Sequence, residues 1–347
     1  MSPVDVHRPP ERGFHALAVK RVVRETPDAV SLVFHTPEYL TERFRYKPGQ
    51  FLTLRVVVNG EEHLRCYSMS SAPAVGEDLQ VTVKRVPGGI VSNWLNDTVR
   101  EGDGIEVTVP GGAFVLDQTE RDVVAFAGGS GITPVFSIVK TALAASTRRV
   151  RLLYANRDHQ SVIFADALAQ LATRHADRCV IAHHLDDEQG FVGSRDIADF
   201  LDAVRDVDFY VCGPTPFMDT VEQALTICGV PSERIHVEQF AAAPWEELDV
   251  APELVTLSAE VSFQLEGRRT VAQHDPGATL LRTARSAGLK APASCEIGEC
   301  ATCMAKVVEG SAVMRHNGAL TPEEVAEGWV LTCQALPMSS SLTVVYE

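Results

Sequence analysis

The sequence lacks any long apolar run. No stretch approaches the roughly 18 residues that would cross a bilayer, and the first residues contain no hydrophobic core of a secretion signal. The chain also lacks an excess of basic charge, because its formal net charge is −15. An acidic chain repels nucleic acid and anionic lipid at long range. We therefore expect a cytoplasmic protein whose partners include neither nucleic acid nor a membrane.

Internal repeats and low-complexity tracts are absent too. Apolar residues make up 45% of the 347 residues and charged residues 22%, a composition typical of globular proteins. Because a domain typically holds roughly 100 to 200 residues, the length predicts two or three domains. Acidic side chains outnumber basic ones most strongly in the middle of the chain, between residues 116 and 254.

Successive segments differ in the period of their apolar residues. Residues 13–115 alternate apolar and polar in short runs between Pro and Gly turns, which predicts an antiparallel β-barrel. Residues 116–240 alternate strand-like and helical runs, which predicts an α/β domain whose ligands bind beyond the carboxyl ends of parallel strands. Residues 241–254 have no apolar periodicity and predict a linker. Residues 255–347 mix strands with a helix and predict a small α+β domain.

Three cysteines lie within nine positions near the end of the chain, and a fourth follows after a gap of 29 residues. Cys295, Cys300, Cys303 and Cys333 have the spacing of a plant-type 2Fe-2S site, in which a loop supplies three thiolates and a distant strand the fourth. Zinc sites more often use two C-x2-C pairs, and this sequence has one such pair. A disulfide framework does not suit a reducing compartment. The pattern favours an iron-sulfur cluster, with zinc or plain core cysteines as alternatives.

A polar motif in the barrel segment combines a guanidinium, a phenol and a hydroxyl. It reads "RCYSMSS", from Arg65 to Ser71, and by itself it is a weak signal. The motif is followed by "VTVKR" and "GGIVSNWL", where Gly89 to Ser92 would open a helix whose N-terminal amides suit a phosphate. The combination indicates a nucleotide-like ligand on the barrel.

Two glycine turns follow strand-like runs in the α/β segment. In "GGSGITP", Gly129 and Gly131 let the backbone approach a pyrophosphate, and Pro134 suits the first turn of a helix. The second turn, "CGPTPFM", begins at Cys212. A single glycine turn is weak evidence, but two turns at the same edge of a sheet indicate a dinucleotide site.

Together, "RCYS", "GGSGITP", "CGPTPF" and the four cysteines resemble the ferredoxin-NADP reductase superfamily, specifically reductases with a C-terminal plant-type ferredoxin domain. The resemblance implies an FAD-binding barrel at 13–115, an NAD(P)H-binding α/β domain at 116–240 and, after the linker, a β-grasp 2Fe-2S domain at 255–347. Stretches such as "YKPGQFLTLRV" and "LLYANRDHQSVIF" are most similar to the reductases of 3-ketosteroid 9α-hydroxylases, whose relatives serve Rieske oxygenases.

The resemblance also implies roles for single residues. Arg65 would hold the flavin pyrophosphate, Tyr67 would stack on the flavin, and Ser68 would hydrogen-bond flavin N5. Cys212 would lie near the nicotinamide, while Glu238 and Phe240 would approach the flavin edge. Further residues implied in cofactor binding are Val83, Lys84, Gly89, Val91, Ser92, Gly129, Ser130, Gly131, Thr133, Asn156, Arg157, Gly213, Pro214 and Phe217.

The implied function is an electron relay from NADH through FAD and a 2Fe-2S cluster to a Rieske-type terminal oxygenase. The alternative is the reductase of a di-iron monooxygenase or of a phenylacetyl-CoA epoxidase-like system that uses NADPH. We favour NADH because Arg157, which could bind a 2′-phosphate, is followed by Asp158 in the most acidic part of the chain. Readings from other classes are a zinc-bearing interaction module and a self-sufficient NADH oxidase or flavin reductase. We expect a monomer.

Overall fold

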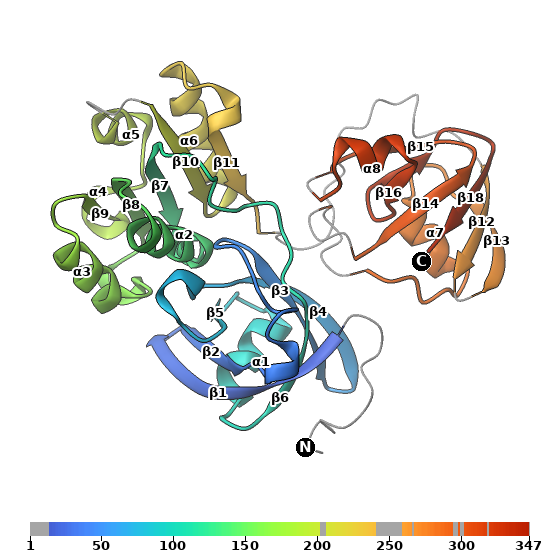
Figure 1. Cartoon of the computed structure of the whole chain (residues 1–347), viewed down its shortest axis with the longest axis horizontal. Coiled ribbons are helices and arrows are strands. Elements are labelled where there is room, and N and C mark those ends of the chain that lie inside the picture. The colour runs from blue at the N-terminus through green and yellow to red at the C-terminus, as the bar shows by residue number, and fades with distance from the viewer. Residues whose placement is uncertain are drawn as a thin grey trace. The chain divides into compact units, whose positions relative to one another are not determined.

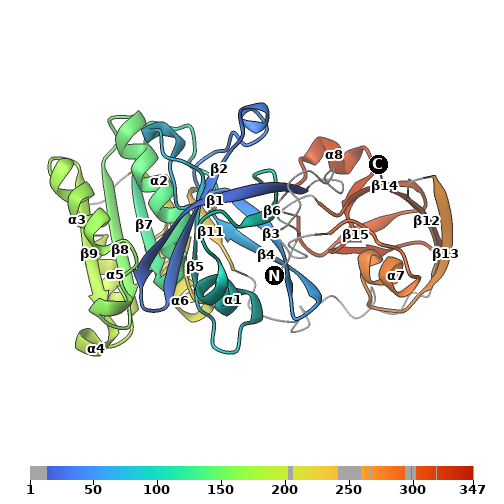
Figure 2. The same ribbon diagram turned by 90° about the horizontal axis from the view of Figure 1, so that it is seen from below.

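The computed structural model describes residues 14–201, 206–240, 259–265, 267–293, 298, 302–317 and 319–346. The chain divides into two compact units (Figures 1 and 2), of which the first ends at Phe240. The predicted linker at 241–254 lies outside the described residues. No helix in the described ranges is long and apolar enough to span a membrane.

An antiparallel sheet of six strands forms the N-terminal part of the first unit, in the order β4-β3-β6-β1-β2-β5 (Figure 1). Its strands are β1 (Phe14–Thr26), β2 (Ala29–His35), β3 (Phe51–Val58), β4 (Glu61–Ser68), β5 (Gln80–Lys84) and β6 (Gly104–Thr108). The sheet curls so that the chain just after β4 approaches β5, where Met69 bridges Val81 and the Ser70 N–H donates to the Gln80 carbonyl. The predicted barrel is confirmed as an antiparallel half-barrel.

Helix α1 (Ile90–Thr98) covers part of this half-barrel. Its apolar residues Val91 and Leu95 are buried in the barrel core. Asn96 faces the same way and donates to the Val83 carbonyl, while Arg24 donates to the Asn96 side chain. The predicted helix is confirmed, and these hydrogen bonds tie its last turn to β5 and β1.

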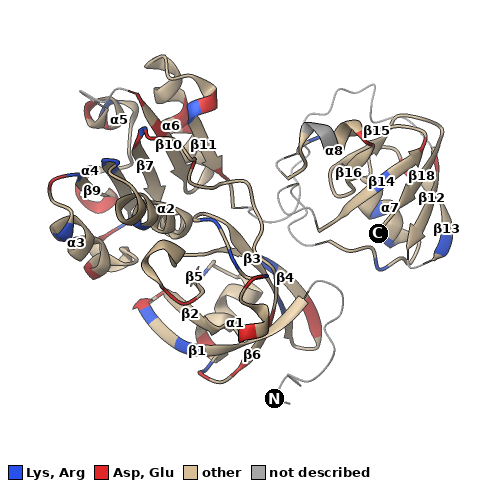
Figure 3. Cartoon of the chain, viewed as in Figure 1, with Lys and Arg blue, Asp and Glu red and all other residues tan. Residues whose placement is uncertain are grey.

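A parallel sheet of five strands follows, in the order β11-β10-β7-β8-β9. Its strands are β7 (Asp122–Gly128), β8 (Val150–Asn156), β9 (Cys179–Leu185), β10 (Val207–Cys212) and β11 (Ile235–Glu238). Its helices are α2 (Ile132–Ala145), α3 (Ala165–Arg174), α4 (Asp186–Gln189), α5 (Ser194–Phe200) and α6 (Thr215–Ile227). The charged residues of this domain lie mostly near the strand ends and on the surrounding helices (Figure 3). The predicted α/β domain is confirmed.

Alternate residues of the central strand β7 face two separate cores. Ala125 packs with the buried residues of α2 and α3, whereas Phe126 packs with those of α5 and α6. Strand β7 is therefore covered on both faces, which explains why "DVVAFA" is a continuous apolar run. This packing leaves the carboxyl ends of the strands to the two glycine turns.

The second unit contains a mixed sheet of five strands in the order β13-β12-β18-β14-β16 and a two-stranded sheet of β15 and β17. Its elements are β12 (Ala259–Leu265), β13 (Arg268–His274), α7 (Leu280–Ser286), β14 (Met304–Glu309), β15 (Ala312–Met314), α8 (Pro322–Ala326), β16 (Trp329–Leu331), β17 (Ala335–Pro337) and β18 (Ser341–Val345). Strands β12 and β18 are parallel, and the other neighbours in the mixed sheet are antiparallel. The predicted α+β class is confirmed.

Candidate functional site

The two glycine turns touch each other at the carboxyl ends of β7 and β10. A Cβ atom on Gly131 would lie 2.1 Å from the carbonyl oxygen of Cys212, and one on Gly213 would lie 2.8 Å from the Phe217 ring. A Cβ atom on Gly128 would lie 2.8 Å from Pro214. Side chains at these glycines would therefore force the turns apart. Backbone of this kind, without side chains, forms a cradle that fits a dinucleotide.

The first turn leads directly into helix α2. Gly129 has a φ of +51°, and its carbonyl accepts a hydrogen bond of 3.0 Å from the Tyr154 hydroxyl. The Thr133 hydroxyl donates to the Ser130 carbonyl at 3.1 Å, and Pro134 lies in the first turn of the helix. The N-terminus of this 14-residue helix therefore opens at the turn, where its backbone amides suit a phosphate.

Ser68, Cys212 and Glu238 meet where the half-barrel adjoins the parallel sheet. Cys212 pairs with Glu238 in the register of β10 and β11, and the Ser68 hydroxyl at the end of β4 donates to Glu238 Oε2 at 3.5 Å. Cys212 is fully buried, and burial, followed by the charge of Glu238, raises the pKa of its thiol. Phe240 lies two residues further on and is 38% exposed. Glu238 thus connects the half-barrel, through Ser68, with the strand of the parallel sheet that ends at Cys212.

Arg65 and Tyr67 precede Ser68 on the same strand. The Arg65 side chain is exposed and donates to the Leu64 carbonyl at 2.7 Å, so most of its guanidinium can still take an anion. Tyr67 packs against the barrel core, and burial raises the pKa of its phenol. This strand end thus offers a cation next to an aromatic ring.

The start of α1 is the second tight backbone region on the half-barrel. A Cβ atom on Gly89 would lie 2.6 Å from Ser92 Oγ, and that hydroxyl accepts a hydrogen bond of 3.1 Å from the Val86 N–H. Val83 and Val91 point into the barrel core, so their side chains do not face a ligand. A group bound here would contact their backbone atoms.

A cavity of about 340 Å³ lies beside these two regions. Its charged lining residues are Lys84, Arg85, Arg157 and Asp28. Burial lowers the pKa of Lys84, whose Nζ lies 3.5 Å from the point that a Gly129 Cβ would occupy. The sequence predicted Lys84 and Arg157, but Asp28 belongs to no motif and was missed.

The side chain of Asn156, at the end of β8, is 4% exposed. Its amide lies beside the Tyr154 hydroxyl, yet neither its oxygen nor its nitrogen reaches hydrogen-bond geometry with any residue that the structure describes. A buried polar group without a partner costs about 1–3 kcal/mol. A ligand with a hydroxyl or phosphate oxygen would offset that cost, so the amide fits a nucleotide.

Two of the four predicted cluster ligands are described, and both are buried. Cys303 lies just before β14, and Cys333 lies just after β16. The N–H and the hydroxyl of Thr332 both donate to the Cys303 carbonyl, at 3.1 and 2.9 Å. The long gap in sequence is thereby closed in space. Gly298 has a φ of +89°, and a Cβ atom there would lie 3.0 Å from the Gln334 side chain. Cys295 and Cys300 lie outside the described residues.

The chemistry of this donor set fits an iron-sulfur cluster. Thiolates are soft ligands that suit iron-sulfur clusters or zinc and do not suit hard cations such as magnesium. Small backbone-rich loops around a cluster let N–H groups approach its sulfurs. Gly298 fits this requirement, because its φ is positive and a Cβ atom there would crowd Gln334, the residue after Cys333.

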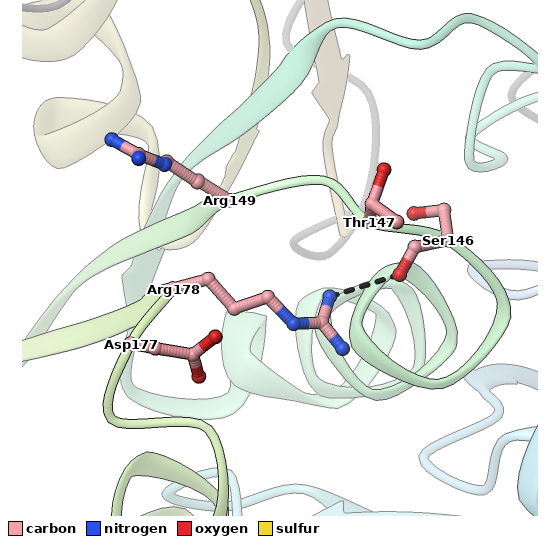
Figure 4. A pocket seen from close by; sticks show the side chains of 5 residues that line it. All are labelled: Ser146, Thr147, Arg149, Asp177 and Arg178. Atoms are coloured by element: carbon pink, nitrogen blue, oxygen red, sulfur yellow. Dashed lines mark hydrogen bonds between the residues drawn. The ribbon is translucent and has the colours of Figure 1, made fainter.

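Another pocket, of about 370 Å³, lies at the opposite, amino end of the parallel sheet (Figure 4). It is lined by Ser146, Thr147, Arg149, Asp177 and Arg178. The Arg178 guanidinium donates to the carbonyls of Leu143, Ser146 and Arg148 around the end of α2, and Arg149 points away from it (Figure 4). The Arg178 guanidinium therefore satisfies backbone carbonyls at and just beyond the end of α2.

Comparison with known proteins agrees with this geometry. Models of the oxidoreductase FAD-binding domain, the oxidoreductase NAD-binding domain and the 2Fe-2S iron-sulfur cluster binding domain match residues 16–116, 126–223 and 263–338. The match to the cluster-binding family, together with the thiol donors, excludes the zinc module. The predicted domain boundaries themselves remain predictions.

Full-length relatives share this organisation. The chain is 38% identical to the ferredoxin reductase component of 3-ketosteroid-9-alpha-monooxygenase from Rhodococcus rhodochrous, over 95% of this chain and 96% of that protein. It is 35% identical to one of the subunits of the 1,2-phenylacetyl-CoA epoxidase from Escherichia coli, over 96% of this chain and 98% of that protein.

A solved structure is also similar over nearly the whole chain. Phthalate dioxygenase reductase, described as a modular structure for electron transfer from pyridine nucleotides to [2Fe-2S], aligns with a TM-score of 0.60 and 26% identity, over 96% of this chain and 98% of the other. The chain belongs to the ferredoxin-NADP reductase-like oxygenase reductases, which transfer electrons from NAD(P)H through FAD to a C-terminal 2Fe-2S domain.

Proposed function

We propose that the protein takes electrons from NADH and delivers them to a Rieske-type oxygenase, with a 3-ketosteroid 9α-hydroxylase as the first candidate. The observation that carries the first step is the meeting of Ser68, from the half-barrel, with Cys212 and Glu238, from the parallel sheet. At this point a flavin held by the half-barrel and a nicotinamide held by the glycine turns would face each other. When bound, FAD can take up the two electrons of a hydride together and release them one at a time, as a 2Fe-2S cluster requires.

The half-barrel residues would bind and orient the flavin. Arg65 and the first amides of α1, between Gly89 and Ser92, offer positive charge and N–H donors for the pyrophosphate. Tyr67 offers an aromatic face, and its raised pKa keeps the phenol neutral. The Ser68 hydroxyl can donate a hydrogen bond to the reactive edge of the ring.

The parallel sheet would hold the nicotinamide cofactor. The close approach of Gly131 and Cys212 would let both backbones reach the ligand, and the raised pKa of the buried Cys212 keeps its thiol neutral. Lys84 can meet the pyrophosphate near Gly129, and the Asn156 amide can pair with a ribose hydroxyl. These assignments use polar groups whose hydrogen-bonding capacity the described structure leaves available.

Cys295, Cys300, Cys303 and Cys333 would ligate the cluster. Thr332 links the Cys303 carbonyl to the Tyr346 hydroxyl, which donates to the Thr332 hydroxyl at 3.1 Å. This chain of hydrogen bonds is buried, so it holds the backbone of two ligand segments in a fixed relation. Ligands held in place favour electron transfer, because the geometry of the site then changes little when the cluster gains or loses an electron.

NADH is proposed over NADPH because the cation that would meet a 2′-phosphate is already paired. Arg157 donates to Asp28 at 3.3 Å, and Asp158 follows it in sequence. Support for the oxygenase partner is the relative from Rhodococcus rhodochrous, which the chain matches along its length. A second candidate is an epoxidase-like system that uses NADPH, supported by the relative from Escherichia coli.

Coupled turnover tests the proposal. The holoprotein is mixed with the terminal oxygenase of a 3-ketosteroid 9α-hydroxylase and its substrate, or in a parallel experiment with the other components of a phenylacetyl-CoA epoxidase. We expect substrate-dependent NADH consumption and hydroxylated product in the first mixture. Turnover in the second mixture alone, or turnover with NADPH in preference to NADH, would replace the first candidate by the second.

A further inference from the structure

The charged cavity beside the glycine turn contains one acidic side chain among three basic ones. Lys84, Arg85 and Arg157 contribute the positive charge, and Asp28 contributes the negative charge. Arg85 is paired with Asp97 at 2.5 Å on the other side, so it is partly neutralised. Asp28 is therefore the acidic side chain of the cavity lining that an anion approaching Arg157 would meet.

Asp28 is held in place by its own turn. It lies between β1 and β2, where its carbonyl accepts from the Arg85 N–H at 2.7 Å and its carboxylate accepts from the Thr26 hydroxyl at 2.8 Å. The other carboxylate oxygen faces Arg157 at 3.3 Å, and the Asp28 side chain is 27% exposed. A carboxylate on the half-barrel thus reaches a guanidinium on the parallel sheet.

Arg157 lies where an adenosine ribose is expected. Strand β8 is the neighbour of β7, which leads into the first glycine turn, and Arg157 directly follows the last residue of β8. In dinucleotide folds the adenosine ribose lies over this part of the sheet, and an arginine there accommodates a 2′-phosphate. In this chain the Arg157 guanidinium instead contacts Asp28 and the Ser161 hydroxyl, at 3.3 and 3.0 Å.

We propose that Asp28 is a specificity-determining residue for the nicotinamide cofactor. Its carboxylate occupies one edge of the Arg157 guanidinium and repels a 2′-phosphate, so cofactors without that phosphate are selected. This inference rests on the proposed use of NADH and names the group responsible. Asp158 adds negative charge near Arg157, but its carboxylate accepts from the Ser161 N–H at 2.8 Å, whereas Asp28 accepts directly from the guanidinium.

The size of the effect follows from screened electrostatics. A 2′-phosphate carries a charge of about −1.5 to −2, and its repulsion by one partly exposed carboxylate a few ångströms away lowers affinity by roughly tenfold. A 5′-phosphate bound near Gly129 and Lys84 would be less affected, because Asp28 acts on Lys84 through charge alone but hydrogen-bonds Arg157 directly. The ratio of the two affinities therefore isolates Asp28 from any general change in net charge.

The test measures the binding of two adenosine probes to the FAD-loaded, full-length protein. Adenosine 2′,5′-bisphosphate carries the 2′-phosphate and 5′-AMP lacks it, and the dissociation constant of each is obtained by titration calorimetry. In Asp28→Asn, which keeps the shape and the acceptor for Thr26, we expect the bisphosphate to bind about tenfold more tightly relative to 5′-AMP. A ratio unchanged from that of the native protein would overturn the proposal.

Three further variants make the result specific. Asp28→Glu keeps the charge and should keep the native ratio. Asp78→Asn is the matched control, because it removes a carboxylate paired with Lys20 on the same half-barrel without touching the cavity, and it should also keep the native ratio. Asp28→Asn combined with Arg157→Gln should lose the gain. A gain in the control, or a gain that survives loss of Arg157, would refute the role of Asp28.

The cofactor proposal is judged separately, on the native protein, by kcat/KM for NADH against NADPH. A native preference for NADPH would refute the proposed use of NADH, whereas the ratio of probe affinities in Asp28→Asn would still decide whether this carboxylate repels a 2′-phosphate. The two failures therefore have different signatures.

Discussion

Replacing Gly131 by alanine tests whether contact between the two glycine turns builds the nicotinamide site. Gly131 has a φ of −61° and a ψ of −11°, which alanine adopts without strain, so the change acts through the added methyl group alone. That carbon would lie 2.1 Å from the Cys212 carbonyl oxygen, whereas real contacts of this kind stay above 3.0 Å. The turns must therefore separate by about 0.9 Å, the difference between these distances.

Such a separation has two consequences. Overpacking against rigid backbone lowers the free energy of unfolding by about 1–3 kcal/mol, which for a domain of this size lowers the melting temperature by roughly 3–10 °C. A misplacement of about 1 Å between reacting groups costs on the order of 100-fold in rate. We expect kcat/KM for NADH-dependent ferricyanide reduction by the Gly131→Ala protein to fall by this factor.

Gly193→Ala is the matched control. Gly193 precedes α5 with a φ of −111°, and the nearest atom to its added Cβ is Asp196 Oδ2 at 3.6 Å. The two variants and the native protein are compared, with FAD bound, by thermal melting and by steady-state ferricyanide reduction. If Gly131→Ala behaved like Gly193→Ala in both measurements, the close approach of the turns would not be what positions the cofactor.

Two substitutions and one labelling experiment test the relay, the buried thiol and the opposite end of the sheet. Cys333→Ser should abolish the iron-sulfur absorption and electron delivery to an oxygenase while NADH-dependent ferricyanide reduction persists; loss of both activities would contradict the order of the relay. Burial raises the pKa of the Cys212 thiol, so iodoacetamide at about pH 8.5 should alkylate the exposed Cys228 of the native protein and spare Cys212. Peptide mass spectrometry measures the labelling, and equal labelling of the two cysteines would contradict this expectation. Asp208→Asn leaves the buried Arg148 without its carboxylate, so urea unfolding should show a loss of about 3–5 kcal/mol, and an unchanged midpoint would refute it.

The central strands could be predicted from the sequence because their surroundings are uniform. Strand β7 is covered on both faces, so "DVVAFA" is apolar whichever neighbour pairs with it. Strands β15, β16 and β17 were missed, because each has three residues, too few to display a period. They form where distant segments pair, as when β16 joins β14. Such pairing is a property of the folded chain and not of the local sequence.

The site was predictable where its geometry demands a particular residue. Gly89 and Gly131 stand where a Cβ atom would collide, so their positions are visible as motifs. Asp28 stands where many residues would fit the turn, and the group it pairs with lies 129 residues away. Its importance comes from contact with a residue that is distant in sequence but close in space, and no short sequence pattern records such a contact.

Two buried polar side chains of the parallel sheet, Asp208 near its amino end and Asn156 at its carboxyl end, differ in how their hydrogen bonds are satisfied. At the amino end, Asp208 is fully buried but accepts hydrogen bonds from Thr119, Arg121 and Arg148, so folding alone satisfies it. At the carboxyl end, the Asn156 amide is just as enclosed and has no partner among the described residues. Folding without a ligand carries that cost, which a bound cofactor removes. Cofactor binding and stability are therefore coupled at the carboxyl end, where the glycine turns admit a ligand.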